Sequence, residues 1–425
     1  MRIAVVGTGI SGSVVARRLC REHEITVFEA ADYVGGHTHT VDVELGGVRY
    51  AVDTGFIVFN DRTYPNFIAL LEELGVASRP TQMGFSVRCE RSDLEYNGAS
   101  LSTLFAQRRN LLRLSFHRML CDIIRFNREA PALLDVEDDG RTLGEVLRAG
   151  GYSREFVEKY LVPMAAAIWS AEPDNIYRFP ARSFIRFFKN HGLLDVGNRP
   201  QWRVVAGGSR SYVEPLVRPF RDRIRLRTPV RGVTRHANHV EIRCEGHPPE
   251  RFDCVFIAAH SDQALGMLRD ATPEERAVLA AIPYQENDVV LHTDASFLPR
   301  RRRAWAAWNY HIFPEARQRA AVTYNMNLLQ GLDAPEQLLV TLNCADRIDP
   351  GRVLARYRYD HPVFLPGSVE AQARNAEING ARRTFYCGAY WRNGFHEDGV
   401  CSALQALRHF EEWRGHAEQP LRRVG

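Results

Sequence analysis

The sequence is poor in lysine. Lys159 and Lys189 are the only lysines among 55 Lys and Arg residues, so arginine carries nearly all of the positive charge. The formal net charge is only +4, which is too small to indicate nucleic-acid binding by itself. We therefore expect no nucleic-acid partner.

Cysteine pairs and long apolar runs are also missing. The eight cysteines are scattered and form no C-x-x-C pair, so we expect reduced thiols rather than a disulfide framework or a zinc site. No uninterrupted apolar stretch is as long as a membrane span, and no charged and apolar leader precedes Arg2. We expect a cytoplasmic protein without a metal site.

The first forty residues contain the strongest motif of the chain. Arg2–Val6 is a short β-branched run that predicts a buried parallel strand. It is followed by Gly7-Thr8-Gly9-Ile10-Ser11-Gly12, by a helical stretch from Ser13 to about Arg21, and by a second strand, Glu24–Phe28, which Glu29 closes. This order predicts a dinucleotide-binding βαβ unit, although a G-x-G-x-x-G alone can also mark an ordinary turn.

Each residue type in this motif has a physical reason. Gly7 allows the tight turn out of the strand, Gly9 lets a pyrophosphate approach the backbone, and Gly12 lets the helix lie close to the sheet. The helix N-terminus offers free N–H groups and a partial positive charge to phosphates. The Glu29 carboxylate can accept hydrogen bonds from a ribose and would repel a 2′-phosphate, which argues against NADP at this site.

A second glycine pair follows closely, in Val34-Gly35-Gly36-His37-Thr38. Here the chain resembles the flavin amine oxidase and phytoene desaturase superfamily, whose members carry an acid-ended Rossmann strand followed by such a loop. Arginines usually flank that loop in amine oxidases, whereas Tyr33 and His37 stand here. The resemblance implies an α/β fold with a discontinuous, glutathione-reductase-like Rossmann domain for FAD, and an α+β substrate domain.

Three later segments extend the resemblance over the whole chain. Asp53-Thr54-Gly55-Phe56 is similar to the family's turn close to the flavin ring, and Val204–Leu216 is similar to its second G-G turn. The family uses the position of Val230 for a backbone contact with adenine, and Phe385–Val400 resembles its last strand-loop-helix motif. The resemblance implies non-covalent FAD held by Gly7, Gly9, Ser11, Gly12, Glu29, Gly35, Gly36, His37, Thr38, Gly55, Val230, Gly388, Asp398, Gly399 and Val400. The Val400 N–H is expected at a helix N-terminus, where it can stabilise negative charge on reduced flavin.

We expect the FAD domain to comprise residues 1–85, 200–270 and 370–425. Residues 86–199 and 271–369 form the expected substrate domain, which combines a helical insertion with a β-sheet. In residues 101–134, apolar side chains recur at helical spacing and alternate with arginines. This pattern predicts an amphipathic helix, either with a solvated arginine face or with a basic surface that touches anionic lipid at the inner membrane. A further run, Arg300–Arg303, precedes two tryptophans.

No second G-x-G-x-x-G follows a strand later in the chain. The absence of a second motif favours a flavin that is reduced by the substrate rather than by a nicotinamide. Candidate catalytic residues near the ring, by motif, are His396, Glu397 and Trp391, with Tyr310 from the β half. For His396 the alternative is a structural hydrogen bond at the helix start. Many amine oxidases hold a water at flavin N5 with a lysine, but the corresponding strand, Asn287–Thr293, has none.

Three functions stay open. The sequence is most similar to bacterial FAD-binding oxidoreductases that accompany fatty-acid-modifying methyltransferases, some of which desaturate methyl-branched acyl chains for furan fatty acid synthesis. This resemblance implies dehydrogenation of an acyl chain by hydride transfer to flavin N5. The second function is an oxygen-using amine oxidase. The third is a non-redox isomerase or a flavin-binding scaffold, because residues 35–38 also resemble a loop of flavin-dependent sugar mutases. The exact substrate, electron acceptor and oligomeric state stay open.

Overall fold

A computed structural model describes residues 1–195, 197–315 and 319–418. Its central element is a parallel sheet of five strands in the order β10-β2-β1-β14-β20. The strands are β1 (Arg2–Val6), β2 (Glu24–Phe28), β10 (Ile224–Arg225), β14 (Cys254–Ile257) and β20 (Thr384–Tyr386). Because β1, β2 and β14 are largely buried, they have the continuous apolar character of strands covered on both faces.

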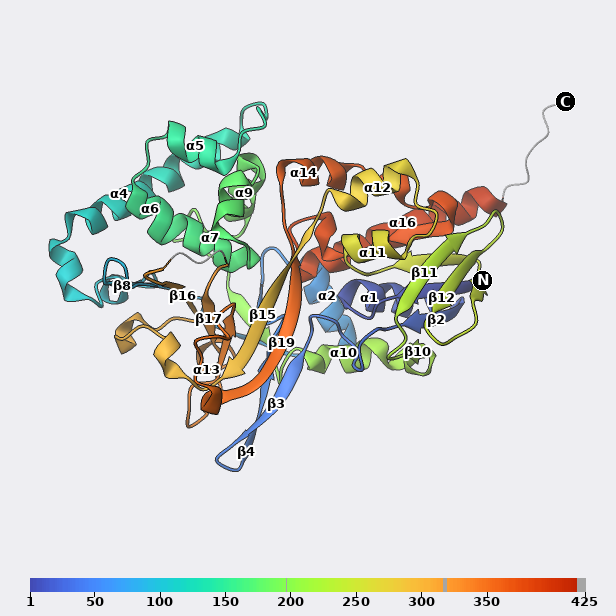
Figure 1. The fold of residues 1–425 in the computed structure, drawn as a ribbon, viewed down its shortest axis with the longest axis horizontal. Coiled ribbons are helices and arrows are strands. Elements are labelled where there is room, and N and C mark those ends of the chain that lie inside the picture. Colours follow the sequence, from blue (N-terminus) through green and yellow to red (C-terminus); the bar gives the residue numbers. More distant parts are fainter. Residues whose placement is uncertain (196, 316–318, 419–425) are drawn as a thin grey trace.

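Helices surround this sheet, as Figure 1 shows. Some that are far apart in the sequence, such as α1 and α16, pack against each other. They are α1 (Ile10–Leu19), α2 (Pro65–Leu74), α10 (Arg210–Val217), α11 (Ser261–Met267), α12 (Pro273–Ala280), α14 (Pro366–Ala373), α15 (Asn375–Ile378) and α16 (His396–Glu418). A three-stranded antiparallel sheet also lies here, made of β11 (Val230–Arg235), β12 (Val240–Cys244) and β13 (Glu250–Phe252).

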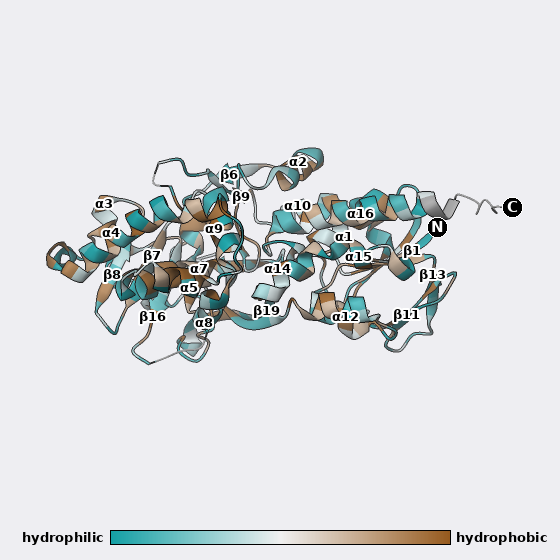
Figure 2. Ribbon diagram, turned by 90° about the horizontal axis from the view of Figure 1, so that it is seen from above, coloured by the Kyte–Doolittle hydropathy of each residue, from teal (hydrophilic) through white to brown (hydrophobic). Residues whose placement is uncertain are grey.

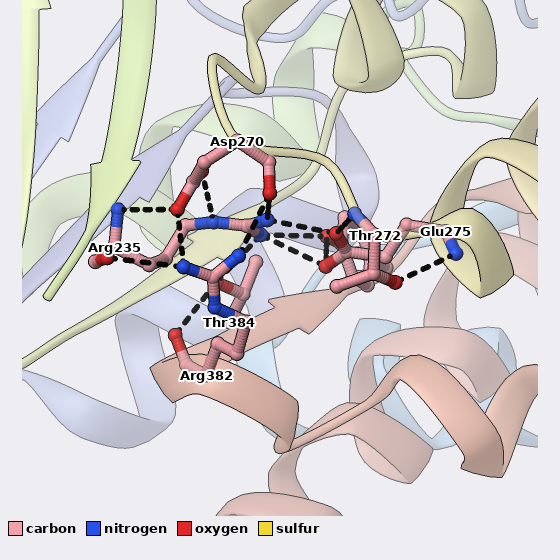
Figure 3. A network of polar contacts seen from close by, with 7 residues as sticks. Arg235, Asp270, Thr272, Glu275, Arg382 and Thr384 are labelled. Atoms are coloured by element: carbon pink, nitrogen blue, oxygen red, sulfur yellow. Dashed lines mark hydrogen bonds and ion pairs between the residues drawn. The ribbon is translucent and has the colours of Figure 1, made fainter. Parts of the chain in front are cut away.

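A buried ion cluster joins this small sheet to the central one (Figure 3). Arg235, at the end of β11, forms 2.7 Å ion pairs with Asp270 and with Glu275 of α12, and its side chain is fully buried. The Tyr386 hydroxyl of β20 donates to Glu275 at 2.6 Å. Because every charge in the cluster has a partner, it fixes the position of β11 relative to β20.

The other half of the molecule contains a seven-stranded mixed sheet, in the order β19-β15-β18-β17-β16-β7-β8. Its strands are β7 (Phe85–Cys89), β8 (Leu94–Asn97), β15 (Tyr284–His292), β16 (Trp308–Ile312), β17 (Val322–Asn325), β18 (Leu339–Leu342) and β19 (Val353–Pro362). The short helix α13 (Met326–Leu329) follows β17. The long strands β15 and β19 pair over most of their length and run between the two halves (Figure 1).

Helices cover one end of this second sheet. They are α3 (Leu101–Leu104), α4 (Leu114–Glu129), α5 (Leu143–Ala149), α6 (Arg154–Phe156), α7 (Val162–Trp169), α8 (Pro173–Arg178) and α9 (Ala181–Asn190), with one π-helical turn at Val157–Leu161. None of the described helices combines the length and apolar character that crossing a bilayer requires.

The expected single helix over residues 101–134 is wrong. The segment contains α3, a 3-10 helix at Arg108–Leu112, α4 and a second 3-10 helix at Ala130–Leu134. Arg113 has an extended backbone, with φ −91° and ψ 102°, which separates the first 3-10 helix from α4. Leu112 is apolar, but its side chain is exposed.

Two small antiparallel sheets, of two and three strands, complete the described fold. Strands β3 (Thr40–Leu45) and β4 (Val48–Asp53) form a hairpin. Strand β9 (Trp202–Val205) pairs with both β5 (Phe59–Asn60) and β6 (Ser78–Pro80). These pairs lead the chain out of the five-stranded sheet and back to it.

Candidate flavin site

The three glycines after β1 differ in what surrounds them. A Cβ on Gly7 would lie 2.5 Å from the Ala258 carbonyl oxygen, and one on Gly12 would lie 2.0 Å from the Gly7 carbonyl oxygen. A Cβ on Gly9 would meet no atom within 4 Å. Gly7 and Gly12 thus allow strand and helix to lie close together, whereas Gly9 leaves open space beside the backbone.

That open space lies at the start of α1. The N-cap residue Gly9 provides no side-chain cap, and the first turn of α1 contains no acidic residue. The N–H groups there are therefore available to an anion, and the helix dipole favours negative charge at this end. The loop fits a dinucleotide pyrophosphate.

Glu29 lies beside this loop at the end of β2. Its carboxylate accepts hydrogen bonds from the Thr8 N–H at 2.9 Å, the Thr8 hydroxyl at 2.5 Å and the Ala31 N–H at 2.8 Å. The Thr228 N–H, two residues before Val230, donates to the Glu29 carbonyl at 2.8 Å. Glu29 and the segment that leads into Val230 thus lie together at the carboxyl end of β2.

The second glycine pair touches the first motif. A Cβ on Gly36 would lie 3.1 Å from the Gly9 Cα, and the Gly35 N–H donates to the Thr8 hydroxyl at 3.2 Å. Gly35 has φ +126°, a left-handed backbone that only glycine adopts readily. Residues 35–38 therefore lie directly on the phosphate loop, as an extended dinucleotide requires.

Two other motifs, far apart in sequence, meet around a buried carboxylate. Asp53 accepts hydrogen bonds from the Thr40 hydroxyl at 2.6 Å, and from the Ser209 hydroxyl and N–H at 2.8 and 2.9 Å. Burial raises the pKa of Asp53 to about 6. Next to it, a Cβ on Gly55 would lie 2.2 Å from the His37 carbonyl oxygen, which explains the glycine of the D-x-G turn.

The C-terminal block packs against α1. The Ser11 hydroxyl donates to the Gly399 carbonyl at 2.9 Å, and a Cβ on Gly399 would lie 2.6 Å from Ile10. The Gly388 N–H, just after β20, donates to the Ser402 hydroxyl of α16 at 2.9 Å. Ser11, Gly388 and Gly399 thus hold α16 to the phosphate loop.

Helix α16 begins at His396, four residues before Val400. Val400 therefore lies in its second turn and not at its N-terminus, which corrects the role expected for its N–H. Asp398 accepts hydrogen bonds from the Phe395 and Asn393 N–H groups at 2.9 and 3.2 Å, and so stabilises the start of the helix. Desolvation raises the pKa of Asp398 to about 7.

His396 lies in a closed set of contacts. Its ring stacks on Phe56 with centroids 3.6 Å apart, and its Nε2 lies 2.6 Å from the Tyr212 hydroxyl and 3.2 Å from the Thr38 hydroxyl. Desolvation lowers the pKa of His396 to about 3, so the imidazole is neutral. Tyr212 and Phe56 were not predicted here, although Tyr212 is part of the helix after the second glycine turn.

The other three catalytic candidates are separated. Glu397 accepts hydrogen bonds from the Asn66 and Phe67 N–H groups at 3.1 and 2.9 Å, at the N-terminus of α2. Trp391 is buried against Tyr390, with ring centroids 4.9 Å apart. Tyr310 lies in β16 of the second sheet, and no hydrogen bond or ring contact joins it to the C-terminal block within the described chain.

An aromatic wall lies directly before α16. We use this name for Trp169, Phe179, Phe184, Phe187 and Phe188, all of which are buried. Phe187 stacks on Phe395 with centroids 5.1 Å apart, and the Trp169 Nε1 donates to the Asn393 carbonyl at 3.3 Å. Helix α9, which carries Phe184, Phe187 and Phe188, also contains Arg182, Arg186 and Lys189.

Sequence reasoning also missed a group of histidines beside the phosphate loop. The ring of His37 lies 5.9 Å from that of His260 and 5.6 Å from that of His361. Desolvation lowers the pKa of all three. In the described chain the His260 Nδ1 and the Asp360 Oδ1 are buried without a hydrogen-bond partner, so both are available to a bound cofactor.

Strand β15 has no lysine, as predicted. Asn287 is buried there, and its Nδ2 lies 3.0 Å from the His361 Nδ1. Its Oδ1 accepts a hydrogen bond from Asn343 at 2.8 Å. Lys159 and Lys189 lie in the helical insertion. No cluster of potential metal ligands occurs among the described residues.

Residues 10–349 match the family model "Flavin containing amine oxidoreductase". The chain belongs to this family. The predicted superfamily, the α/β fold with a Rossmann-type domain and the flavin cofactor are therefore confirmed. The assignments of single site residues stay predictions.

Among curated proteins, one from Mycobacterium tuberculosis (strain CDC 1551 / Oshkosh) matches this family member. It carries the provisional name flavin-containing monoamine oxidase AofH and is 30% identical over 257 residues. The match covers 56% of this chain and 53% of the relative, so the chain spans about half the length of the curated relatives it matches.

Solved structures match over nearly the whole chain. Cyclohexylamine oxidase from Brevibacterium oxydans IH-35A has a TM-score of 0.70 at 15% identity, covering 97% of this chain and 99% of that one. A fatty acid isomerase from P. acnes, described as producing CLA, has a TM-score of 0.67 at 16% identity, covering 96% and 98%. At such low identity these likenesses show the fold alone.

Proposed function

We propose that the protein is an FAD-dependent dehydrogenase that desaturates an acyl chain of a lipid. The single observation that carries the substrate class is the aromatic wall, a group of buried apolar rings of which Phe187 stacks on Phe395 directly before α16. Transfer of an apolar chain from water into such surroundings is favourable, by about 0.8 kcal/mol for each buried CH2 group. The family match supports the flavin chemistry.

The residues present fit non-covalently bound FAD. Gly9 and the N-terminus of α1 would receive the pyrophosphate, and Glu29 would receive the ribose. The loop of residues 35–38 would lie along the dinucleotide. When bound, FAD supplies a two-electron acceptor for hydride.

The chain's own residues explain why an apolar substrate is favoured over an amine cation. The carboxylates that adjoin Phe395 are Glu397 and Asp398, and backbone N–H groups bind both of them. A protonated amine placed there would lose water without gaining a free carboxylate partner, which costs free energy. The neutral His396 imidazole and the Tyr212 hydroxyl form a short polar contact at the same place.

An amine oxidase is the second candidate. It is favoured by the family match and by the relative that bears a monoamine oxidase name. A neutral amine could be oxidised without a carboxylate partner, so the aromatic wall does not exclude it.

The experiment is an anaerobic absorbance titration of the purified holoprotein. Phospholipids with saturated, unsaturated and methyl-branched acyl chains are added first, and a panel of alkyl and aromatic amines is added to a second sample. The proposal predicts loss of the oxidised-flavin bands with acyl lipid alone. Bleaching by amines alone would assign the second function instead. Dithionite serves as the control, because it must reduce the flavin in either case.

A further inference from the structure

One end of the molecule exposes an unusual number of large apolar side chains. We call α3, the 3-10 helix at Arg108–Leu112, the first half of α4 and the 3-10 helix at Arg302–Ala304 the lobe tip. In Figure 2 the labels α3 and α4 lie at the end of the molecule opposite the N-terminus. Leu101, Leu112 and Leu114 are 77%, 89% and 86% exposed, and Leu111 is also exposed.

These leucines are held outward by an ordered turn. The side chains of Gln107 and Asn110 point inward and are fully buried. Gln107 accepts a hydrogen bond from the Glu95 N–H at 3.0 Å and donates to the Asp93 carbonyl at 3.0 Å. Asn110 donates to the Glu95 carbonyl at 3.2 Å. Because amides occupy the inward positions, the neighbouring leucines must face solvent.

The charge of the lobe tip has one sign. Residues 101–121 contain four arginines and no acidic residue, and residues 295–308 contain the four-arginine run and no acidic residue. The 3-10 helix of the second segment packs against α3. In the described part of the chain, Arg108, Arg118 and Arg303 form no ion pair or hydrogen bond. Arg109 and Arg301 of the tip pair with Asp93 and Glu95, so the unneutralised positive charge lies on the three arginines without a partner.

We propose that the lobe tip docks on the surface of an anionic lipid bilayer. Exposed leucines beside unpaired arginines match the two components of such a surface, the acyl boundary and the charged headgroups. A nucleic acid would neutralise the arginines but would leave the leucines without an apolar partner. This inference goes beyond the proposed function, because docking requires no redox step and no particular substrate.

The chain provides its own reporter for the test. Cys121 is in α4, three residues after Arg118, and it is the one exposed cysteine of the described chain; six others are buried and Cys401 is partly buried. A polarity-sensitive dye on Cys121 of the holoprotein is mixed with vesicles of phosphatidylglycerol and phosphatidylcholine, or of phosphatidylcholine alone. We expect a blue shift and co-sedimentation with the anionic vesicles only, reversed by about 0.5 M salt.

Two variants separate charge from apolar contact. R108E/R118E is expected to weaken binding at least about a hundredfold, because each arginine near an anionic surface contributes several-fold. L112S/L114S is expected to weaken it about tenfold or more, and to reduce the blue shift. The matched control is R218E/R276E, which makes the same charge change at two exposed arginines of the other half and should bind like the native protein.

The outcomes are decisive. If R218E/R276E lost as much vesicle binding as R108E/R118E, net charge alone would explain the binding. That result would overturn the proposal of a specific docking surface. A dye signal that stays unchanged with every vesicle composition would overturn lipid docking and assign the leucines to a protein partner. Thermal unfolding and flavin content of each variant show whether it is folded. A failure of lipid docking would leave the result of the anaerobic titration, and therefore the proposed function, unaffected.

Discussion

Replacing Gly9 by alanine should separate cofactor binding from folding. The added Cβ would meet no atom within 4 Å, so the free protein has space for it. Gly9 has φ −58° and ψ 175°, which alanine adopts without strain. Alanine also restricts the unfolded chain, so the flavin-free variant should be as stable as the native protein or more stable, by about 0.4–1 kcal/mol.

The same Cβ should prevent close approach of a phosphate. A backbone N–H donating to a phosphate oxygen lies about 2.9 Å from it, whereas a methyl carbon needs about 3.5 Å from any non-bonded atom. The pyrophosphate must therefore move away from the N–H groups of α1. Losing one or two charge-assisted hydrogen bonds costs about 1.5–3 kcal/mol each, which predicts a loss of FAD affinity of at least about tenfold, and of about a hundredfold or more if two bonds are lost.

The assay combines flavin fluorescence titration of the apoprotein with its urea unfolding. Gly12→Ala is the contrasting variant, because its Cβ would lie 2.0 Å from a backbone oxygen and should destabilise the fold itself. Gly367→Ala is the matched control, since its Cβ also meets no atom within 4 Å, in α14. Native affinity for FAD in Gly9→Ala would refute the placement of the dinucleotide on this loop.

Three further variants test structural roles. Arg235→Met leaves the buried Glu275 carboxylate without a cation, whereas Asp270 keeps its ion pair with Arg382, and should cost about 3–5 kcal/mol of unfolding free energy, measured by urea denaturation; a smaller loss than about 1 kcal/mol would contradict the cluster's role. Glu397→Gln should lower stability by about 1–3 kcal/mol but leave turnover per bound flavin unchanged; a large drop in turnover would make Glu397 catalytic after all. Asp398 has a raised pKa of about 7, so the folded state holds a proton that the unfolded chain releases above about pH 4. Stability therefore falls as pH rises from about 4 to 7, by at most about 4 kcal/mol, and Asp398→Asn should remove this slope; an equal slope in the variant would disprove the assignment.

The N-terminal unit was predictable because its structure is local. Strands β1 and β2 have the predicted bounds, and α1 differs from the prediction by a few residues at each end. The spacing of the glycines encodes contacts between residues that are near in sequence, such as Gly7 with Gly12. Glu29 lies where its spacing placed it, beside Thr8.

Long-range contacts explain what sequence reasoning missed. The catalytic role of Glu397 stays a prediction, but the contact of its carboxylate with the N-terminus of α2, across more than 300 residues, is one that no local pattern could indicate. The histidines around His37 come from three separate segments, so no local pattern could reveal them. In residues 101–134 the apolar spacing is helical, but the inward-facing amides Gln107 and Asn110 favour a turn.

Mass spectrometry of a single anaerobic turnover tests the central claim most directly. Acyl lipid is mixed with less than one equivalent of oxidised holoprotein. The acyl chains are then recovered and their masses are measured. The account predicts a chain that has lost two hydrogen atoms, in an amount equal to the flavin bleached. An acyl chain of unchanged mass with a moved double bond would contradict it in favour of an isomerase. An unchanged chain, with an imine or aldehyde formed from an amine in a parallel sample, would contradict it in favour of an amine oxidase.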